Sequence, residues 1–259
     1  NYLLIFYLKI IKKKSIKLIY VNLTKLLSMD EYSNFETFLY ISPEKLIISV
    51  NKKDDLRNIY LNELMIEGNN ETDLLYDFLD KNIYKIEKIL KNFIKTINII
   101  IESDILFPVQ MSVKRSNYGE VTSEKQIIYL LNEAKNEIKR TINNKKIIHM
   151  IINNYLVDNQ NYLTLPNNLS CKSLCLDISF ICLPINHIKK LEEILKQFQI
   201  SVDHISSAKY LKSFLNETQN DLFKMCQYLI DGHNPNEVKI VPKIQKNLSF
   251  FERFFNYFS

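Results

Sequence analysis

The chain has 259 residues, and its apolar fraction of 46% is ordinary for a folded globular protein, which argues against a disordered chain. The net charge of +5 suits an anionic membrane surface, but the lysines are spread along the sequence, so specific binding to nucleic acid is not expected. The 3 glycines lie far apart, which excludes the glycine-rich loops that bind phosphate groups in nucleotide-binding proteins.

Residues 1–34 precede the first predicted element, and the first methionine is Met29. We interpret these residues as an N-terminal extension that need not be native. Residues 2–8 are apolar, but this run is too short to cross a bilayer and is followed at once by lysines. No small-residue cleavage site follows it, so we expect neither a transmembrane helix nor a signal peptide.

The first elements are predicted to be short strands followed by one long helix. Apolar runs at residues 35–40 and 45–50 predict two strands of a hairpin or meander, and residues 59–66 fit a third. The polar residues 69–73 mark a helix start. Apolar residues then recur at helical spacing, at Leu75, Phe78, Leu79, Ile83, Ile86, Leu90, Phe93, Ile94 and Ile97.

The middle of the chain continues this alternation. Residues 99–113 return to strand-like character. Ser123 and Gln126 form a capping box, which satisfies the free N–H groups at the start of a helix. The predicted buried face of that helix consists of Ile127, Leu131, Ala134 and Ile138. Residues 147–152 are predicted to form a strand, and residues 174–182 alternate as a strand with one buried face does.

The last predicted elements are three helices and a short strand. The helices cover residues 186–198, 208–215 and 222–230, and the strand covers residues 202–205. Gly232 and the residues beside it stop the third helix. Because strands and helices mix along the whole chain, the sequence predicts an α/β or α+β fold.

Residues 247–259 carry the most informative pattern. Wound as a helix, this segment places its apolar side chains on one arc, consisting of Leu248, Phe250, Phe251, Phe254, Phe255, Tyr257 and Phe258. Basic side chains accompany it, namely Lys243, Lys246 and Arg253. We therefore predict an amphipathic helix that binds anionic lipids of the inner membrane. The apolar and basic contributions add to roughly 6–8 kcal/mol, which makes a reversible anchor.

No residues stand out as catalytic or as ligands of a metal or cofactor. Three cysteines and a histidine carry zinc-binding atoms but lack the spacing of a zinc site, and buried cysteines of a reduced cytosolic protein explain them better: Cys171, Cys175, Cys182 and His187. His149 is interpreted as a hydrogen-bonded core histidine. The acidic pairs at residues 54–55 and 192–193 are interpreted as solvated surface. We therefore expect no enzymatic activity.

One stretch resembles a known family. In residues 147–160, the residues His149, Tyr155, Val157, Asp158 and Gln160 match the "HxIPxxYxVDxQ" pattern of the bacterial cell-division protein FtsA, with Asn153 in the place of proline. Pro166 and Leu169 resemble the "NPxGL" stretch that follows, with Asn168 in the place of its glycine. The resemblance covers roughly residues 100–208. It implies an actin-like (ribonuclease H-like) fold with an inserted SHS2 subdomain and a C-terminal membrane helix.

The chain also departs from that family. Residues 40–43 lack the aspartate and glycine of the first phosphate loop, and a second lobe, which carries the main FtsZ-binding surface, is not expected after residue 206. We therefore expect neither ATP binding nor direct FtsZ binding. The resemblance implies five parts: an extension (1–34), the remnant of an actin-like first lobe (35–99 and 207–235), the SHS2 subdomain (100–206), a tether (236–246) and the membrane helix (247–259).

Together these features predict a non-enzymatic adaptor without a cofactor on the cytoplasmic face of the bacterial inner membrane, at the division site. The resemblance implies that the SHS2 subdomain contacts division proteins and further copies of the chain. Two alternatives remain open. The chain could be a platform of the pilus-assembly type, which also uses actin-like folds, or a soluble interaction module whose C-terminal helix packs internally.

Overall fold

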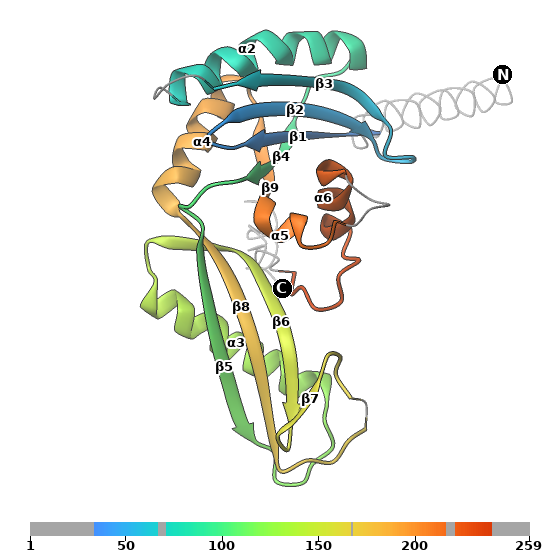
Figure 1. Cartoon of the computed structure of the whole chain (residues 1–259), viewed down its shortest axis with the longest axis vertical. Coiled ribbons are helices and arrows are strands. Elements are labelled where there is room, and N and C mark those ends of the chain that lie inside the picture. The colour runs from blue at the N-terminus through green and yellow to red at the C-terminus, as the bar shows by residue number, and fades with distance from the viewer. Residues whose placement is uncertain (1–33, 67–70, 167, 216–220, 240–259) are drawn as a thin grey trace, which may run out of the picture. The chain divides into compact units, whose positions relative to one another are not determined.

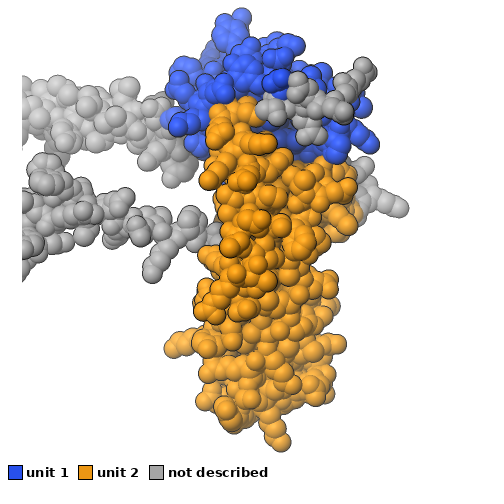
Figure 2. Space-filling model, turned by 90° about the vertical axis from the view of Figure 1, so that its left-hand side faces the viewer, with its two compact units in different colours: residues 1–100, 195–204 blue, residues 101–194, 205–259 orange. Residues whose placement is uncertain are grey.

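The computed structural model describes residues 34–66, 71–166, 168–215 and 221–239. The chain divides into two compact units, which Figure 2 colours separately. Unit 1 comprises residues 1–100 and 195–204, and unit 2 comprises residues 101–194 and 205–259. Each unit is described by itself below.

Unit 1 is built on a five-stranded sheet (Figure 1). Its strands are β1 (Phe35–Ile41), β2 (Lys45–Lys52), β3 (Asn58–Met65), β4 (Thr96–Ile101) and β9 (Ser201–Ser207), in the order β3-β2-β1-β4-β9. The last residue of β4 and the last three residues of β9 are counted with unit 2. The first three strands form the predicted antiparallel meander. Five of the six residues of β4 are buried, as expected of an inner strand covered on both faces.

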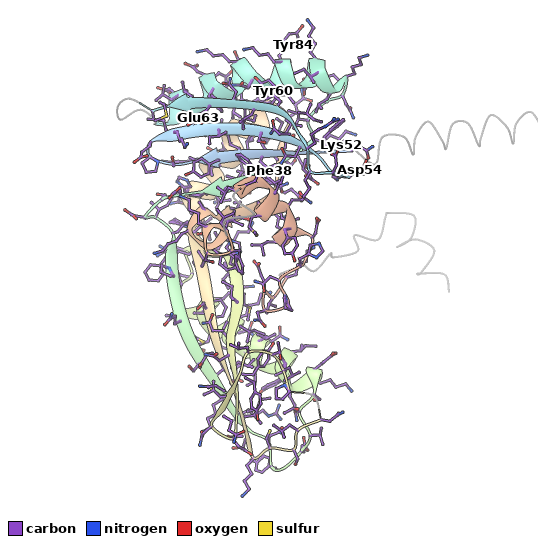
Figure 3. All side chains as sticks on the ribbon, turned by 45° about the vertical axis from the view of Figure 1, so that its right-hand side comes forward. Phe38, Lys52, Asp54, Tyr60, Glu63 and Tyr84 are labelled. Carbon is purple, nitrogen blue, oxygen red and sulfur yellow. The ribbon has the colours of Figure 1, made fainter. Side chains whose placement is uncertain are left out.

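The helix α2 (Glu71–Leu90) covers one face of this sheet (Figure 1). The hydroxyl of Tyr60 on β3 donates a hydrogen bond to Asn82 Oδ1 on α2 at 2.6 Å, whereas the nearby Tyr84 is 72% exposed (Figure 3). The predicted helix was too long. Lys91 adopts a left-handed backbone conformation with φ of 53°, which ends the helix after Leu90.

Because α2 ends at Leu90, the residues predicted to form its last turns lie outside the helix. Phe93 is 75% exposed in the connection that follows α2. Ile97 belongs to β4 and is buried there. The helical spacing of these residues is therefore accidental, because a buried strand supplies as many apolar residues as the face of a helix.

Unit 2 contains a four-stranded antiparallel sheet with the order β5-β8-β6-β7 (Figure 1). The strands are β5 (Phe107–Ser116), β6 (Lys145–Val157), β7 (Gln160–Tyr162) and β8 (Ser173–Pro184). β8 has the predicted alternation, with a fully buried face formed by Leu174, Leu176, Ile178, Phe180 and Cys182. That face is covered by the helix α3 (Glu124–Thr141), which supplies Ile127, Leu130, Ala134 and Ile138 to the same core cluster.

The start of α3 confirms part of the sequence prediction. The side chain of Gln126 accepts a hydrogen bond from the Ser123 N–H at 3.0 Å, as in a capping box. The predicted buried position Leu131 is only partly buried, and Leu130 takes the central place instead. The prediction was one residue off because both residues lie within the same apolar stripe.

The remaining helices are α4 (Ile185–Gln197), α5 (Ala208–Lys212) and α6 (Leu222–Ile230). α4 follows β8 directly, so Asn186 lies inside the helix and is not its N-cap. α5 is shorter than predicted. α6 has the predicted bounds; Asp221 caps it by accepting hydrogen bonds from two backbone N–H groups, and Gly232 adopts a φ of 85° just after its end.

The fold class is confirmed: the protein is a mixed α/β protein. The strand order of unit 1, in which a meander is followed by two further strands on the far side of β1, agrees with a partial actin-like (ribonuclease H-like) lobe. β9 carries residues 201–207, most of which were assigned to the SHS2 segment, into this five-stranded sheet.

Candidate functional site

The stretch that resembles the FtsA family forms the centre of unit 2. Residues 147–157 run along β6, and Gln160 begins β7. Tyr155 and Val157 are buried in the core cluster beneath α3. These two positions of the pattern therefore serve packing.

Asp158 sits in the tight turn between β6 and β7. Asp158 and Asn159 both have positive φ values, 47° and 69°, as a type I′ hairpin turn requires. The Asp158 carboxylate accepts backbone hydrogen bonds from Lys172 at 2.9 Å and from Ser173 at 2.8 Å, at the start of β8. These hydrogen bonds lower the pKa of Asp158 below its usual value. Asp158 thus holds the hairpin to the neighbouring strand.

His149 is a buried, fully bonded histidine, as predicted. The Ser207 N–H donates a hydrogen bond to His149 Nε2 at 3.0 Å, so Nε2 must be unprotonated. The proton therefore lies on Nδ1, which donates to Glu237 Oε1 at 2.6 Å. The imidazole ring joins β6 to the start of α5 and to the segment that follows α6.

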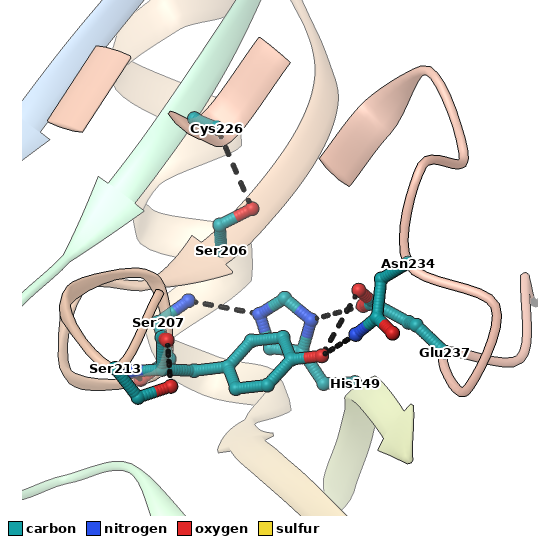
Figure 4. A network of polar contacts seen from close by, with 8 residues as sticks. His149, Ser206, Ser207, Ser213, Cys226, Asn234 and Glu237 are labelled. Carbon is teal, nitrogen blue, oxygen red and sulfur yellow. Dashed lines mark hydrogen bonds and ion pairs between the residues drawn. The ribbon is translucent and has the colours of Figure 1, made fainter. Parts of the chain in front are cut away.

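Glu237 is the hub of a larger polar network (Figure 4). Its second carboxylate oxygen, Oε2, accepts a hydrogen bond from the Tyr210 hydroxyl at 3.2 Å. The same hydroxyl accepts from Asn234 Nδ2 at 2.8 Å, and the Tyr210 ring lies 4.6 Å from the His149 ring. Burial raises the pKa of Tyr210, and the neighbouring Glu237 carboxylate adds to this effect. The network keeps Tyr210 neutral, and each of the two carboxylate oxygens of Glu237 accepts a hydrogen bond.

The backbone beside Glu237 pairs with β6. The Ile152 N–H donates to the carbonyl oxygen of Asn236 at 2.8 Å, and the Val238 N–H donates to that of Met150 at 2.8 Å. The Val238 side chain packs against the core cluster of unit 2. Residues 236–238, which the sequence prediction assigned to a tether, thus form an isolated β-bridge to β6, and we call them the docked strand.

The hydrogen bonds of this network hold segments of unit 2 together and do not pair a nucleophile with a base. A carboxylate, a histidine and a serine are brought together, but His149 contacts the backbone N–H of Ser207 and not its hydroxyl. The Ser207 hydroxyl accepts from the Tyr210 N–H as the N-cap of α5, and Ser207 is 2% exposed. The Ser207 hydroxyl is therefore not hydrogen-bonded to His149 as a serine nucleophile would be to its base.

The residues predicted to bind the membrane lie outside the described residues. This applies to the apolar arc and to its basic companions alike, namely Leu248, Phe250, Phe251, Phe254, Phe255, Tyr257, Phe258, Lys243, Lys246 and Arg253. The described chain ends at Lys239, whose Nζ donates to the carbonyl oxygen of Ile230 at 3.2 Å. In the sequence, the docked strand precedes the predicted membrane helix by eight residues.

Other candidate groups from the sequence are dispersed. The described residues contain no group of three His, Cys, Asp or Glu side chains that could hold a metal ion, and none of the four cysteines there forms a disulfide. Asp54 and Asp55 contact different basic residues, Lys52 and Arg57. None of the helices in the part of the chain that is described is long and apolar enough to span a membrane.

Three exposed apolar or aromatic side chains lie on two adjoining loops of unit 2. Val121 pairs with Ser170 in an isolated bridge, and the Thr122 N–H donates to the carbonyl oxygen of Leu169, so the two loops run side by side. Tyr118 is 90% exposed, Val121 is 50% exposed and Leu169 is 36% exposed. Side chains of this kind on adjoining loops suit a contact with another protein.

Sequence reasoning missed the partners of His149. Tyr210, Asn234 and Glu237 lie in segments interpreted as helix, turn and tether, respectively, and no local pattern connects them to β6. The only available signal was His149 itself, because a histidine inside an apolar strand requires polar partners from elsewhere in the chain.

No protein-family model matches the sequence, and the search of characterised proteins gives no match. Among solved structures, the chain is similar to the cytoplasmic domain of EpsL, an inner-membrane component of the type II secretion system of Vibrio cholerae. The TM-score is 0.37 and the identity 7%, over 68% of this chain and 58% of that one.

Two further structures show comparable similarity. A PilM–PilN type IV pilus biogenesis complex has a TM-score of 0.45 and 6% identity, over 68% of this chain and 48% of that one. A protein from Bacteroides thetaiotaomicron with an actin-like ATPase fold has a TM-score of 0.32 and 13% identity, over 70% of this chain and 55% of that one. The chain spans about half the length of these proteins, and their activities and partners are not carried over to it.

Proposed function

We propose that the protein is a non-enzymatic adaptor that binds the cytoplasmic face of the inner membrane through residues 247–259 and contacts other proteins through unit 2. The observation that carries this proposal is the docked strand at residues 236–238, which joins the folded core of unit 2 to the segment leading to the apolar arc. An amphipathic helix at the end of such a segment has few uses except to bind a membrane or a partner.

The lipid surface is favoured over a protein groove by the charges beside the arc. Three basic residues, Lys243, Lys246 and Arg253, accompany it, and anionic headgroups attract such residues by up to about 1 kcal/mol each. The five phenylalanines contribute about 1 kcal/mol each when partly buried in the interface. Binding of this strength is reversible and benefits from several copies held together.

The protein contact would use unit 2 as an SHS2-like subdomain. The exposed loop residues Tyr118, Val121 and Leu169 offer an apolar surface for a division protein or a further copy of the chain. The role in division is supported by the pattern of residues 147–160, which resembles FtsA. We expect no enzymatic activity and no cofactor, because the scarcity of glycine leaves no phosphate-binding loop in the sequence.

A second candidate is a platform protein of the pilus-assembly type. It shares the membrane attachment and differs in its partners, and the mixed α/β fold suits both. A fluorescent fusion separates the two: concentration at midcell supports the division role, whereas foci that follow the pilus machinery support the second candidate.

Vesicle flotation tests the membrane attachment. The full chain should float with vesicles of anionic lipid, and a chain without residues 247–259 should not. Equal flotation of both would contradict the proposal. If the helix instead packs internally, Phe254→Asp would lower the melting temperature of the protein in the absence of lipid.

A further inference from the structure

Residues 236–238 are held on unit 2 by two kinds of contact. The backbone forms two hydrogen bonds to β6, one on either side of the Ile151–Glu237 bridge, each 2.8 Å long. The Glu237 side chain adds contacts to His149 at 2.6 Å and to Tyr210 at 3.2 Å. Val238 completes the docking by packing against the core cluster.

The short length of the strand makes the side-chain contacts important. Two backbone hydrogen bonds give too little net stability to offset the entropy lost when such a short segment is ordered. Glu237 lies between them and supplies two charge-assisted hydrogen bonds to groups that are themselves ordered by the fold. Glu237 therefore adds the side-chain hydrogen bonds that strengthen the backbone pairing and the packing of Val238.

We propose that Glu237 is a positioning residue: through His149 and Tyr210 it fixes on unit 2 the point from which the membrane-binding segment departs. This inference rests on the proposed function for its use, because a fixed departure point matters only if residues 247–259 bind a surface. The geometry of the docking does not depend on that function.

The number of residues between unit 2 and the anchor gives the maximum distance between the two. With the strand docked, residues 239–246 connect unit 2 to the anchor and reach at most about 28 Å when fully extended. With the strand released, residues 232–246 connect them and reach about 50 Å. Docking thus keeps unit 2 within about half the distance from the membrane that a free tether would allow.

Hydrogen exchange on the full chain in the absence of lipid tests the docking. The amides of Ile152 and Val238 should be protected in the wild type, and Glu237→Ala should speed their exchange at least about tenfold, while amides of β8 keep their rates. Glu133→Gln, which changes an exposed carboxylate on α3, is the matched control and should change neither. Unchanged rates at Ile152 and Val238 in Glu237→Ala would overturn the proposal.

A milder variant covers the case in which Glu237→Ala does not fold. Tyr210→Phe keeps the ring and removes only the hydroxyl that donates to Glu237 Oε2. It should speed exchange at Val238 by severalfold relative to β8 amides. An equal change at both places would mean that the contact serves general stability and would also overturn the proposal.

Neutron reflectometry on a supported bilayer of anionic lipid tests the positioning. The wild type and Glu237→Ala should bind in equal amounts, because the apolar arc is untouched, but the protein layer of the variant should extend further from the membrane, by up to about 20 Å. Layers of equal thickness would overturn the positioning role. A wild type that does not bind at all would contradict the proposed membrane function and leave the exchange result to stand by itself.

Discussion

Glu237 Oε1 lies 2.6 Å from His149 Nδ1, although the two residues are 88 positions apart in the sequence. Because His149 Nε2 accepts the Ser207 N–H, the imidazole can donate only from Nδ1, and Glu237 is its acceptor. The pair joins three segments of unit 2: the strand β6, the start of α5 and the docked strand.

Replacing His149 by alanine should destabilise the protein by about 2–4 kcal/mol, because it leaves the Ser207 N–H and one Glu237 oxygen without partners in a buried place. Glu237→Gln should cost about 1–2 kcal/mol, since the amide can accept only one of the two hydrogen bonds. Urea unfolding followed by circular dichroism measures both. An equal stability of His149→Ala and wild type would contradict the network.

Tyr210 should make stability depend on alkaline pH. Its pKa is raised in the folded state, so the neutral phenol is favoured there. Its contribution is fully present below the unfolded pKa of about 10 and is lost as the pH rises above that value. The stability gap between wild type and Tyr210→Phe should therefore narrow when the pH is raised beyond about 10. A constant gap would show that the hydroxyl is not buried beside Glu237.

Asp158 should make stability depend on acidic pH in the opposite sense. The backbone hydrogen bonds from Lys172 and Ser173 lower its folded pKa, so its contribution is present above the unfolded pKa of about 3.9 and is lost as the pH falls through the folded value. Asp158→Ala should melt at a lower temperature than wild type at neutral pH, and the difference should shrink in acid. Asp158→Asn, which can still accept and tolerates positive φ, should lie between the two.

The core beneath α3 can be tested with two neighbouring positions. Leu130 is fully buried, so Leu130→Ala should cost about 2–5 kcal/mol. Ile128 is 56% exposed on the same helix, and Ile128→Ala should change stability by less than about 0.5 kcal/mol. Chemical unfolding of the two variants side by side provides the measurement, and the reverse order would contradict the packing of α3.

Local sequence patterns were sufficient for elements with one buried face. The alternation in β8 and the stripe of α3 each report burial directly, because strand and helix periods differ. The same reasoning failed at Lys91, where a lysine adopts a left-handed conformation and ends α2 without a glycine to mark it. It failed again at Asn186, because β8 runs into α4 without a loop.

The candidate site was harder to predict because its contacts join residues that lie far apart in the sequence. His149 could be recognised as a histidine needing partners, but Glu237 is the only acidic residue after Asp231 in the described chain and sits in a stretch that has no periodic pattern. Its role follows from the pairing of residues 236–238 with β6. A segment of three residues is too short for its β-propensity to predict such a pairing. Long-range pairing of this kind is decided by tertiary structure.

The affinity of the full chain for anionic vesicles tests the central claim most directly. A double variant, Phe251→Asp with Phe254→Asp, removes two residues of the apolar arc and changes none of the described residues. We expect a dissociation constant between about 1 and tens of micromolar for the wild type, and a loss of at least about tenfold for the variant. Equal binding of the two proteins, or no binding of the wild type, would contradict the account.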